Sequence, residues 1–176
     1  LSIMSKIAFK GDDGALKILS KEIEKDGFKI ISANQFLQNS FFPKGHFAGP
    51  IPFSNFRKEI KRGYEVLKNL SQNDVGQSVA VQNGLVLAIE AIEGTDNMIE
   101  RAGKLKLPGV GPLLIKAPKI NQDMRFDQPV IGEKTIENAQ INGFSAIACK
   151  HKEVLVINLE QVIKLANLKK ITLFGF

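Results

Sequence analysis

Residues 76–90 read GQSVAVQNGLVLAIE, and this stretch decides the fold class. Two apolar runs flank Asn83-Gly84, and Asn-Gly between such runs is the strongest short-range signal for a β-hairpin with a two-residue turn. Hairpin strands are antiparallel, whereas the remainder of the chain alternates helical with strand-like segments, a pattern typical of parallel sheets. The stretch therefore predicts an α/β fold built on a mixed sheet.

The segments around the hairpin predict the other elements from their apolar spacing and their flanking turn residues. Thr95 or Asp96 is expected to cap the short helix that follows the hairpin. Expected helices cover residues 15–26, 54–70, about 95–101, 135–142 and 159–168, and further strands are expected within 28–32, 112–116, 144–150, 153–158 and 171–176.

Residues 40–54, SFFPKGHFAGPIPFS, are predicted to separate two units. The stretch contains three prolines and two glycines, which disfavour regular structure, so it is interpreted as a linker or a binding loop. Ser54 is expected to cap the next helix. We therefore divide the chain into residues 1–53, the end of one domain with its linker, and residues 54–176, a carboxy-terminal α/β domain.

The composition excludes several classes of protein. Among the 176 residues there is no apolar run near the roughly 20 residues that a membrane-spanning helix needs. One cysteine, Cys149, allows neither an internal disulfide nor a Cys-based zinc cluster, and a cytoplasmic location is expected. The net charge of +6 favours anionic partners, but no recognisable nucleic-acid-binding module accompanies it, so nucleic acid is not the expected partner.

Polar residues gather where the apolar runs end, at 74–77, 90–96 and 116–127. Ligands of open α/β sheets bind at such strand ends. Mg²⁺ prefers carboxylate oxygens, and it commonly takes one or two from the protein and the rest from water and phosphates. Candidate metal ligands are Glu90, Glu93, Asp96, Asp123 and Asp127, and candidate cations for a pyrophosphate are Lys116, Lys119 and Arg125.

The stretch NQDMRFDQP, residues 121–129, is the densest of these groups. Asp123, Arg125 and Asp127 recur at every second position, so in an extended chain they would project from one edge. Arg125 suits a bidentate grip on a phosphate. The alternative is that these residues are solvated loop charges and helix caps, since acidic and basic residues mostly lie at the surface.

Two long runs carry a family resemblance: DVGQSVAVQNGLVLAIEAIEGTDNMIERAG at 74–103 and LLIKAPKINQDMRFDQPVIGEKTIENAQINGFSAIA at 113–148. They contain, in order, D-V-G-Q, A-x-E-x-x-E-G-T-D and K-x-x-K-x-x-Q-D-x-R-x-D-x-P-x-x-G. The chain, over about residues 10–176, resembles the UDP-2,3-diacylglucosamine pyrophosphatase family of lipid A biosynthesis.

This resemblance implies a two-domain enzyme, in which substrate lies between a Rossmann-like amino-terminal domain and a distinct α/β carboxy-terminal domain. Residues 1–53 would then be the remnant of a first domain whose opening elements this chain is expected to lack. The implied reaction is Mg²⁺-assisted attack of water on the α-phosphate of UDP-2,3-diacylglucosamine, which gives UMP and 2,3-diacylglucosamine 1-phosphate. The resemblance also implies a homodimer and allows peripheral association with the inner membrane.

The resemblance also assigns roles to residues of this chain. Asp123 is the first candidate for the essential metal-linked carboxylate. One departure, Ile120-Asn121 where the family has Pro-Gly, predicts a different turn before the motif. The implied catalytic residues are Asp123, Asp127 and Arg125, the metal ligands Asp123, Glu90, Glu93 and Asp96, and the substrate-binding residues Lys116, Lys119, Gln122, Thr95 and Gln77.

Two alternatives stay open at the level of the sequence. The first is a truncated, non-catalytic module that binds a UDP-sugar or a phospholipid-like ligand without turnover. The second, less favoured, is a basic domain that binds nucleic acid through its net positive charge.

Overall fold

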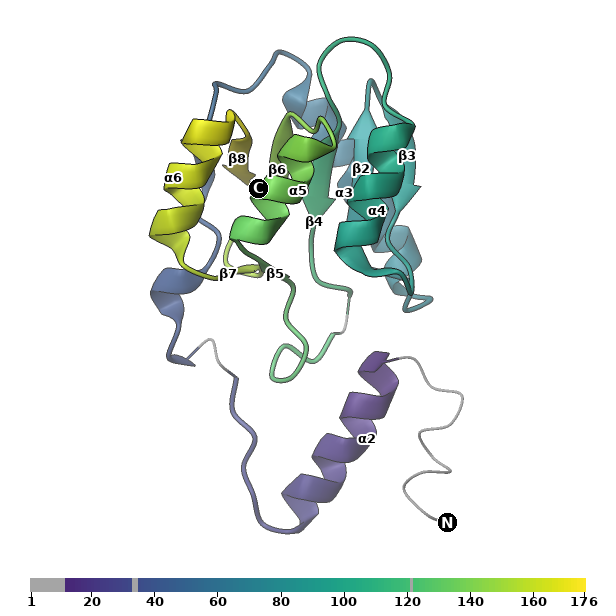
Figure 1. The fold of residues 1–176 in the computed structure, drawn as a ribbon. Coiled ribbons are helices and arrows are strands. Elements are labelled where there is room, and N and C mark those ends of the chain that lie inside the picture. Colours follow the sequence, from purple (N-terminus) through teal and green to yellow (C-terminus); the bar gives the residue numbers. More distant parts are fainter. Residues whose placement is uncertain (1–11, 33–34, 121) are drawn as a thin grey trace.

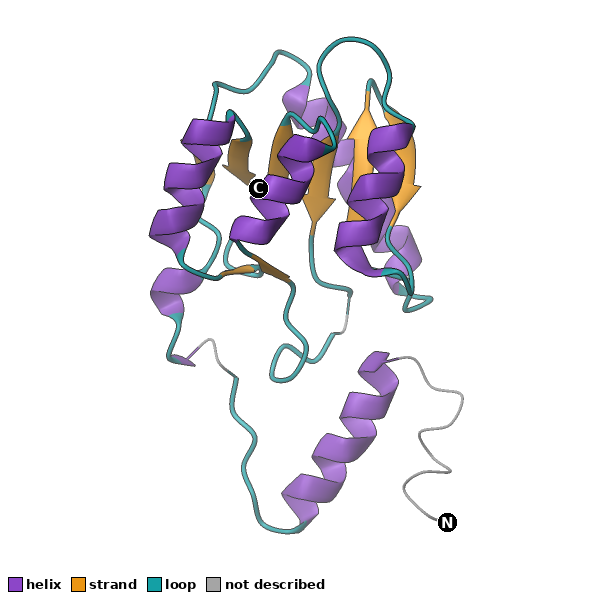
Figure 2. Cartoon of the chain, viewed as in Figure 1, coloured by secondary structure: helices purple, strands orange, loops and turns teal. Residues whose placement is uncertain are grey.

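The structure is a computed structural model that describes residues 12–32, 35–120 and 122–176. The expectations stated for the first eleven residues and for Asn121 lie outside these described residues. A six-stranded mixed sheet with helices on both faces forms the body of the molecule, which confirms the predicted α/β class (Figures 1 and 2). The elements are α2 (Asp12–Lys25), η2 (Gln38–Ser40), β1 (Gly45–Ala48), α3 (Phe56–Ser71), β2 (Ser78–Gln82), β3 (Leu85–Ile89), α4 (Gly94–Lys104), β4 (Leu113–Lys116), β5 (Val130–Ile131), α5 (Glu133–Ile141), β6 (Ala146–Cys149), β7 (Leu155–Val156), α6 (Leu159–Lys169) and β8 (Thr172–Gly175).

The hairpin gives the sheet its mixed character. The strand order is β1-β8-β6-β4-β2-β3, in which β4, β6 and β8 run parallel while β2 is antiparallel to both β3 and β4. Asn83 and Gly84 form the turn with φ of 52° and 76°, the positive values that a two-residue hairpin turn of this type requires. The predicted hairpin is therefore confirmed.

Alternating side chains of the central strands divide the core into two layers. Val79 and Ile115 pack with Phe56, Ile60 and other residues of α3 on one face of the sheet. On the opposite face, side chains of α4, α5 and α6 pack against neighbouring strand residues that point the other way. In Figure 1 these three helices lie in front of the sheet and α3 lies behind it.

Residues 45–48, which were predicted to be irregular, form strand β1 at the edge of the sheet. This prediction was wrong because Pro43 and Pro50 flank the strand and do not interrupt it, and an edge strand tolerates prolines at its ends. β1 pairs antiparallel with β8, with Gly45 opposite Gly175 and His46 opposite Phe174.

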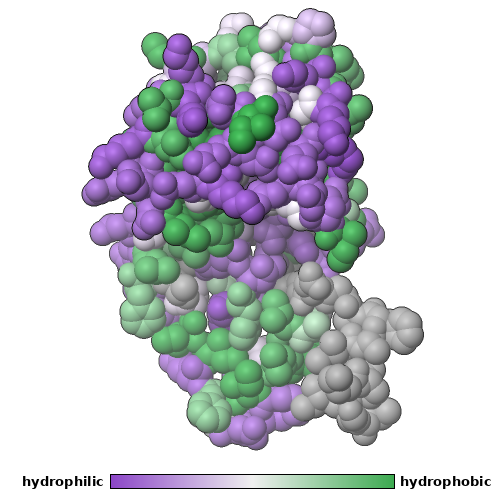
Figure 3. Space-filling view, viewed as in Figure 1, coloured by the Kyte–Doolittle hydropathy of each residue, from purple (hydrophilic) through white to green (hydrophobic). Residues whose placement is uncertain are grey.

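Residues 28–32, which were predicted to be a buried strand, form no strand. Although the run is apolar, it pairs with no strand in the described part of the chain, and Phe28 and Ile31 are exposed to 69% and 43%. Together with Leu19 on α2 they place apolar side chains on the surface, where Figure 3 shows hydrophobic residues over α2 and the segment after it. None of the described helices is both long and apolar enough to cross a membrane.

Several predicted helix starts also need correction. α3 has Asn55, not Ser54, at its N-cap, and no side chain caps it. α4 begins at Gly94, so Thr95 lies inside the helix, where its hydroxyl is free to bond elsewhere.

β7, within the run predicted at 153–158, pairs with β5 in a separate two-stranded sheet.

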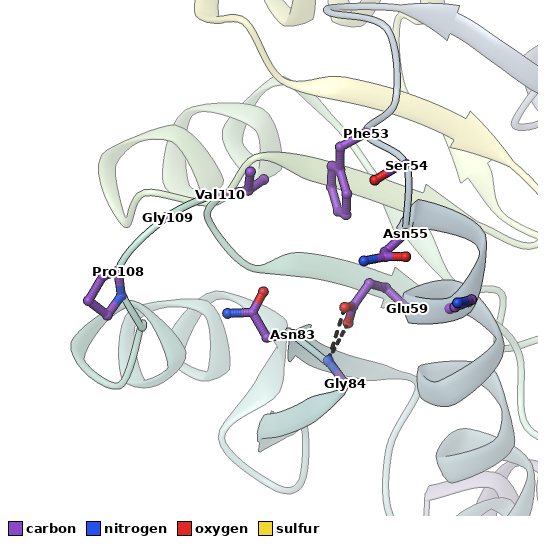
Figure 4. A pocket seen from close by; sticks show the side chains of 10 residues that line it. Phe53, Ser54, Asn55, Glu59, Asn83, Gly84, Pro108, Gly109 and Val110 are labelled. Atoms are coloured by element: carbon purple, nitrogen blue, oxygen red, sulfur yellow. Dashed lines mark hydrogen bonds between the residues drawn. The ribbon is translucent and has the colours of Figure 1, made fainter.

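Glu59 joins α3 to the hairpin turn (Figure 4). It is 6% exposed, and its two carboxylate oxygens accept the Gly84 N–H at 2.9 and 3.1 Å. A cavity of about 530 Å³ lies beside this bond, between Phe53, Asn83 and Val110. A buried carboxylate thus supplies the acceptor for the N–H of the turn and ties the turn to α3.

We expect Glu59→Ala to destabilise the fold by about 1–3 kcal/mol, the scale of losing a hydrogen bond to a charged group. Urea unfolding followed by circular dichroism measures the change. Glu65→Ala, on the exposed side of the same helix, is the matched control and should change stability by less than about 0.5 kcal/mol. Equal losses in the two variants would contradict a structural role for the Glu59–Gly84 bond.

Candidate functional site

Three strand ends bring the motif loops together. Ser78, which begins β2, is paired with Lys116, which ends β4. The Glu90 N–H, just after β3, donates to the Ser78 carbonyl at 2.9 Å. The antiparallel hairpin therefore places the start of β2 beside the ends of β3 and β4. The loops at 74–77, 90–96 and 116–127 consequently leave from the same end of the sheet.

A buried polar cluster lies at this end of the sheet. The Lys116 ammonium donates to Thr95 Oγ1 at 2.8 Å and to Ser78 Oγ at 3.0 Å, and its side chain is only 6% exposed. The Thr95 hydroxyl in turn donates to Glu90 Oε1 at 2.8 Å. The Thr95 hydroxyl thus connects the buried Lys116 ammonium to the Glu90 carboxylate.

One oxygen of the Glu90 carboxylate lies outside this hydrogen-bond network. Its Oε2 is buried and lies 3.8 Å from Lys116 Nζ, which is an ion-pair distance but too long for a hydrogen bond. No hydrogen-bond donor reaches this oxygen from the described residues. Because a buried carboxylate oxygen is costly to leave unsatisfied, Oε2 is the atom of the cluster best placed to accept a ligand proton or a cation.

A second polar cluster lies beside the first, around Asp127. Its Oδ2 accepts hydrogen bonds from Gln77 Nε2 at 3.1 Å and from Gln122 Nε2 at 2.5 Å. Gln122 also accepts the Lys119 N–H at 2.8 Å, while the Lys119 ammonium pairs with Asp74. Two amides therefore hold the Asp127 carboxylate from the same side.

Both clusters border one small hollow of about 220 Å³. Its lining includes Gln77, Glu90, Lys119 and Asp127. Gly76 also lines it, and a Cβ on this glycine would lie 2.1 Å from the Glu90 carbonyl oxygen. Only glycine therefore allows the 74–77 loop to approach the end of β3 this closely. A polar hollow of this size suits a phosphate group better than a whole nucleotide sugar.

Asp123 and Arg125 lie outside the lining of this hollow. Arg125 donates to both oxygens of Asp123, with 2.9 Å from Nε and 2.7 Å from Nη2, and its Nη1 lies 2.7 Å from Glu24 on α2. The Arg125 hydrogen bond keeps the pKa of Asp123 below its usual value. The extended-chain prediction for this stretch was wrong. The backbone carbonyl of Asp123 accepts hydrogen bonds from the backbone N–H groups of Phe126 and Asp127, so the stretch forms a turn.

Glu93 and Asp96 also have basic partners away from the hollow. Glu93, the N-cap residue of α4, bonds to Arg101 of that helix, and this bond lowers the pKa of Glu93. Asp96 Oδ2 lies 3.0 Å from the Lys134 ammonium of α5. Neither carboxylate lines the hollow that Glu90 borders.

Of the five carboxylates predicted to share one cation, the structure brings Glu90 and Asp127 to the hollow. Within the described ranges, no group of three or more His, Cys, Asp and Glu side chains could hold a metal ion. Two carboxylates still fit Mg²⁺, which often takes only one or two from the protein and completes its shell with water and substrate phosphates.

Sequence reasoning missed Ser78 and Asp74 as members of the site. Ser78 is completely buried, and the signal for it was its position at the first residue of a strand that pairs with the strand of Lys116. Asp74 belongs to the D-V-G-Q motif, but its pairing with Lys119 could not be read from spacing. Cys149 is fully buried, and this burial raises the pKa of its thiol.

Comparisons with known proteins identify the family of this chain. Residues 43–174 match the family model described as the LpxI C-terminal domain. Over 166 residues the chain is 36% identical to the UDP-2,3-diacylglucosamine pyrophosphatase LpxI of Caulobacter vibrioides, an alignment that covers 91% of this chain and 59% of that protein. The chain thus spans less than two thirds of the length of this relative. Since the family model covers most of the sequence, the resemblance is confirmed, and the chain belongs to the LpxI family.

Proposed function

We propose that this chain carries the phosphate-binding part of a hydrolase that cleaves UDP-2,3-diacylglucosamine into UMP and 2,3-diacylglucosamine 1-phosphate. The observation that carries the proposal is the buried Lys116–Thr95–Glu90 cluster beside the hollow that Asp127 and Lys119 line. The name of the Caulobacter vibrioides relative supplies the substrate.

Two cations suit a pyrophosphate here: Lys119, which lines the hollow, and Lys116, which belongs to the buried cluster beside it. Lys116 and Lys119 are both largely buried, with 6% and 11% of their side chains exposed, so their charges are weakly screened by solvent. Each is already paired with a carboxylate, and an arriving phosphate would compete with Asp74 for Lys119. Binding of the substrate would therefore replace the Lys119–Asp74 ion pair with a Lys119–phosphate ion pair.

Glu90 and Asp127 are the residues that would hold Mg²⁺ at this hollow, since both line it and Glu90 Oε2 has no hydrogen-bond partner among the described residues. When bound, Mg²⁺ would help to neutralise the negative charge that spreads over the phosphates during phosphoryl transfer.

For the chemical step, we assign to Asp127 the orientation of the attacking water. Gln77 and Gln122 hold Asp127 Oδ2, which leaves Oδ1 to accept a proton from water. The water oxygen bonds to the α-phosphorus, and the bond from that phosphorus to the bridging oxygen breaks. UMP and 2,3-diacylglucosamine 1-phosphate then separate, and Lys116 and Lys119 offset the charge on the phosphates.

Asp123 keeps its proposed role through an exchange at Arg125. A pyrophosphate is a strong partner for a guanidinium, so it can draw Arg125 away from Asp123 and Glu24. Asp123, ionised because the Arg125 bond lowers its pKa, would then be available to a cation or to water.

Incubation of the 176-residue chain with UDP-2,3-diacylglucosamine and Mg²⁺ tests the reaction. We expect release of UMP, measured by chromatography, and we expect chelation of the metal with EDTA to stop it and added Mg²⁺ to restore it. Calorimetric binding of the substrate without any UMP would contradict the proposal and would identify a non-catalytic binding module.

Three aspartate variants test the assignment of residues. We expect Asp127→Asn and Asp123→Asn each to lower kcat by about 100-fold or more, the usual scale for removing one group that stabilises the transition state. Asp96→Asn makes the same chemical change at a residue paired with Lys134, and it should alter kcat by only a few fold. If Asp96→Asn were as damaging as Asp127→Asn, the hollow would not be the reaction site.

A further inference from the structure

A second, apolar groove lies on the face of the sheet that carries α3. Its volume is about 450 Å³, within the usual range of small-molecule pockets. The floor is formed by Tyr64, Phe174 and Phe176, with the Tyr64 and Phe176 rings in edge-to-face contact at 5.3 Å. We call it the α3 groove; its rim carries Lys44, Arg57 and Lys61.

The α3 groove stays open because one helix covers too little of the sheet. α3 packs on β2 and β4, whereas α4, α5 and α6 share the opposite face. α3 reaches Phe174 of β8 through Phe56, its first residue, and the two rings are in edge-to-face contact at 5.3 Å. The aromatic floor is nevertheless only partly buried.

The rim of the α3 groove is basic. Lys44 and Arg57 are exposed, and neither forms an ion pair with any described residue. Lys61 has only a loose pair with the exposed Glu65, at 4.0 Å. Lys150 lies over the Tyr64 ring, with its ammonium 4.7 Å from the ring centroid. No Asp or Glu side chain of the described residues lines the groove, so its side chains favour an anion.

We propose that the α3 groove docks an anionic phospholipid of a membrane surface. The acyl chain would lie on the aromatic floor, and the headgroup phosphate would meet Lys44, Arg57 and Lys61 at the rim. Apolar floor and cationic rim match the two ends of such a lipid. The groove takes a single chain more readily than a stable protein partner, which needs roughly 800 Å² of surface. This inference does not depend on the proposed reaction.

The sheet register places this docking near the polar hollow. Gly175, which lines the α3 groove, is paired with Cys149, and Cys149 is paired with Lys116. Two strand spacings separate the two positions, about 10 Å. A lipid surface bound at the groove would therefore lie at the same end of the sheet as Lys116, on the opposite face.

Tyr64 offers a direct probe, because the chain contains one tyrosine and no tryptophan. The full chain is mixed with phosphatidylglycerol vesicles whose acyl chains carry bromine, which quenches emission only at contact. We expect quenching of Tyr64 fluorescence with these vesicles and little with brominated phosphatidylcholine vesicles, which lack the net negative charge. Vesicle binding without quenching would overturn the proposal by placing the contact elsewhere.

Two matched double variants test the basic rim by vesicle co-sedimentation. Arg57→Gln with Lys61→Gln removes two cations at the groove, whereas Lys58→Gln with Arg62→Gln removes an equally spaced pair about 100° further round the helix. Each basic residue near an anionic membrane contributes roughly fivefold, so the groove pair should lower vesicle affinity on the order of 20-fold and the control pair only a few fold.

Equal losses from the two pairs would mean that net charge alone drives binding, and they would overturn the groove as the docking site. Absence of vesicle binding by the unaltered chain would overturn it as well. If the chain instead dimerised in solution and the dimer shielded Tyr64 from a soluble quencher such as iodide, a second copy would be the occupant and the lipid proposal would be wrong. Circular dichroism confirms that each variant is folded.

Discussion

The site depends on the burial of one lysine. Lys116 ends a central strand with almost no exposed side chain, and a buried charge is stable only if neighbouring groups compensate it. Two hydroxyls and the Glu90 carboxylate supply this compensation, and they come from the start of β2, the end of β3 and the first turn of α4. Satisfying this one ammonium therefore holds three loops together at the edge of the sheet.

Local signals in the sequence predicted those parts of the fold that local physics determines. Asn83-Gly84 requires positive φ values wherever it joins two strands, and the apolar stripe of α3 has helical spacing in any context. The errors at 28–32 and at β1 have another origin. Whether a short apolar run becomes a strand depends on an available neighbour, and β1 is a strand because β8, more than 120 residues later, presents a free edge.

The sequence predicted which residues form the candidate site, but not which of their side chains pair with one another. Gln77, Glu90, Lys116, Lys119 and Asp127 were all named from motifs, and the structure places them around the buried cluster and its hollow. Of the remaining carboxylates, Asp123 and Glu93 pair with arginines near them in sequence, whereas Asp96 pairs with Lys134 of a distant helix. Spacing alone could not show that these pairs lie away from the hollow. A sequence motif shows which side chains are present, whereas the three-dimensional fold determines which cation each carboxylate contacts.

Arg125 connects the site loop to the amino-terminal helix, and this link has a mechanical consequence for the proposed function. Its guanidinium is shared by Asp123 and by Glu24 of α2, and the Ser32 hydroxyl, after α2, donates to the Met124 carbonyl at 3.1 Å. A pyrophosphate that draws Arg125 toward the hollow must break its bond to α2. Since these exposed contacts are individually weak, the strong charge of a pyrophosphate can outweigh them. Binding at the hollow and the placement of α2 would then compete for one guanidinium.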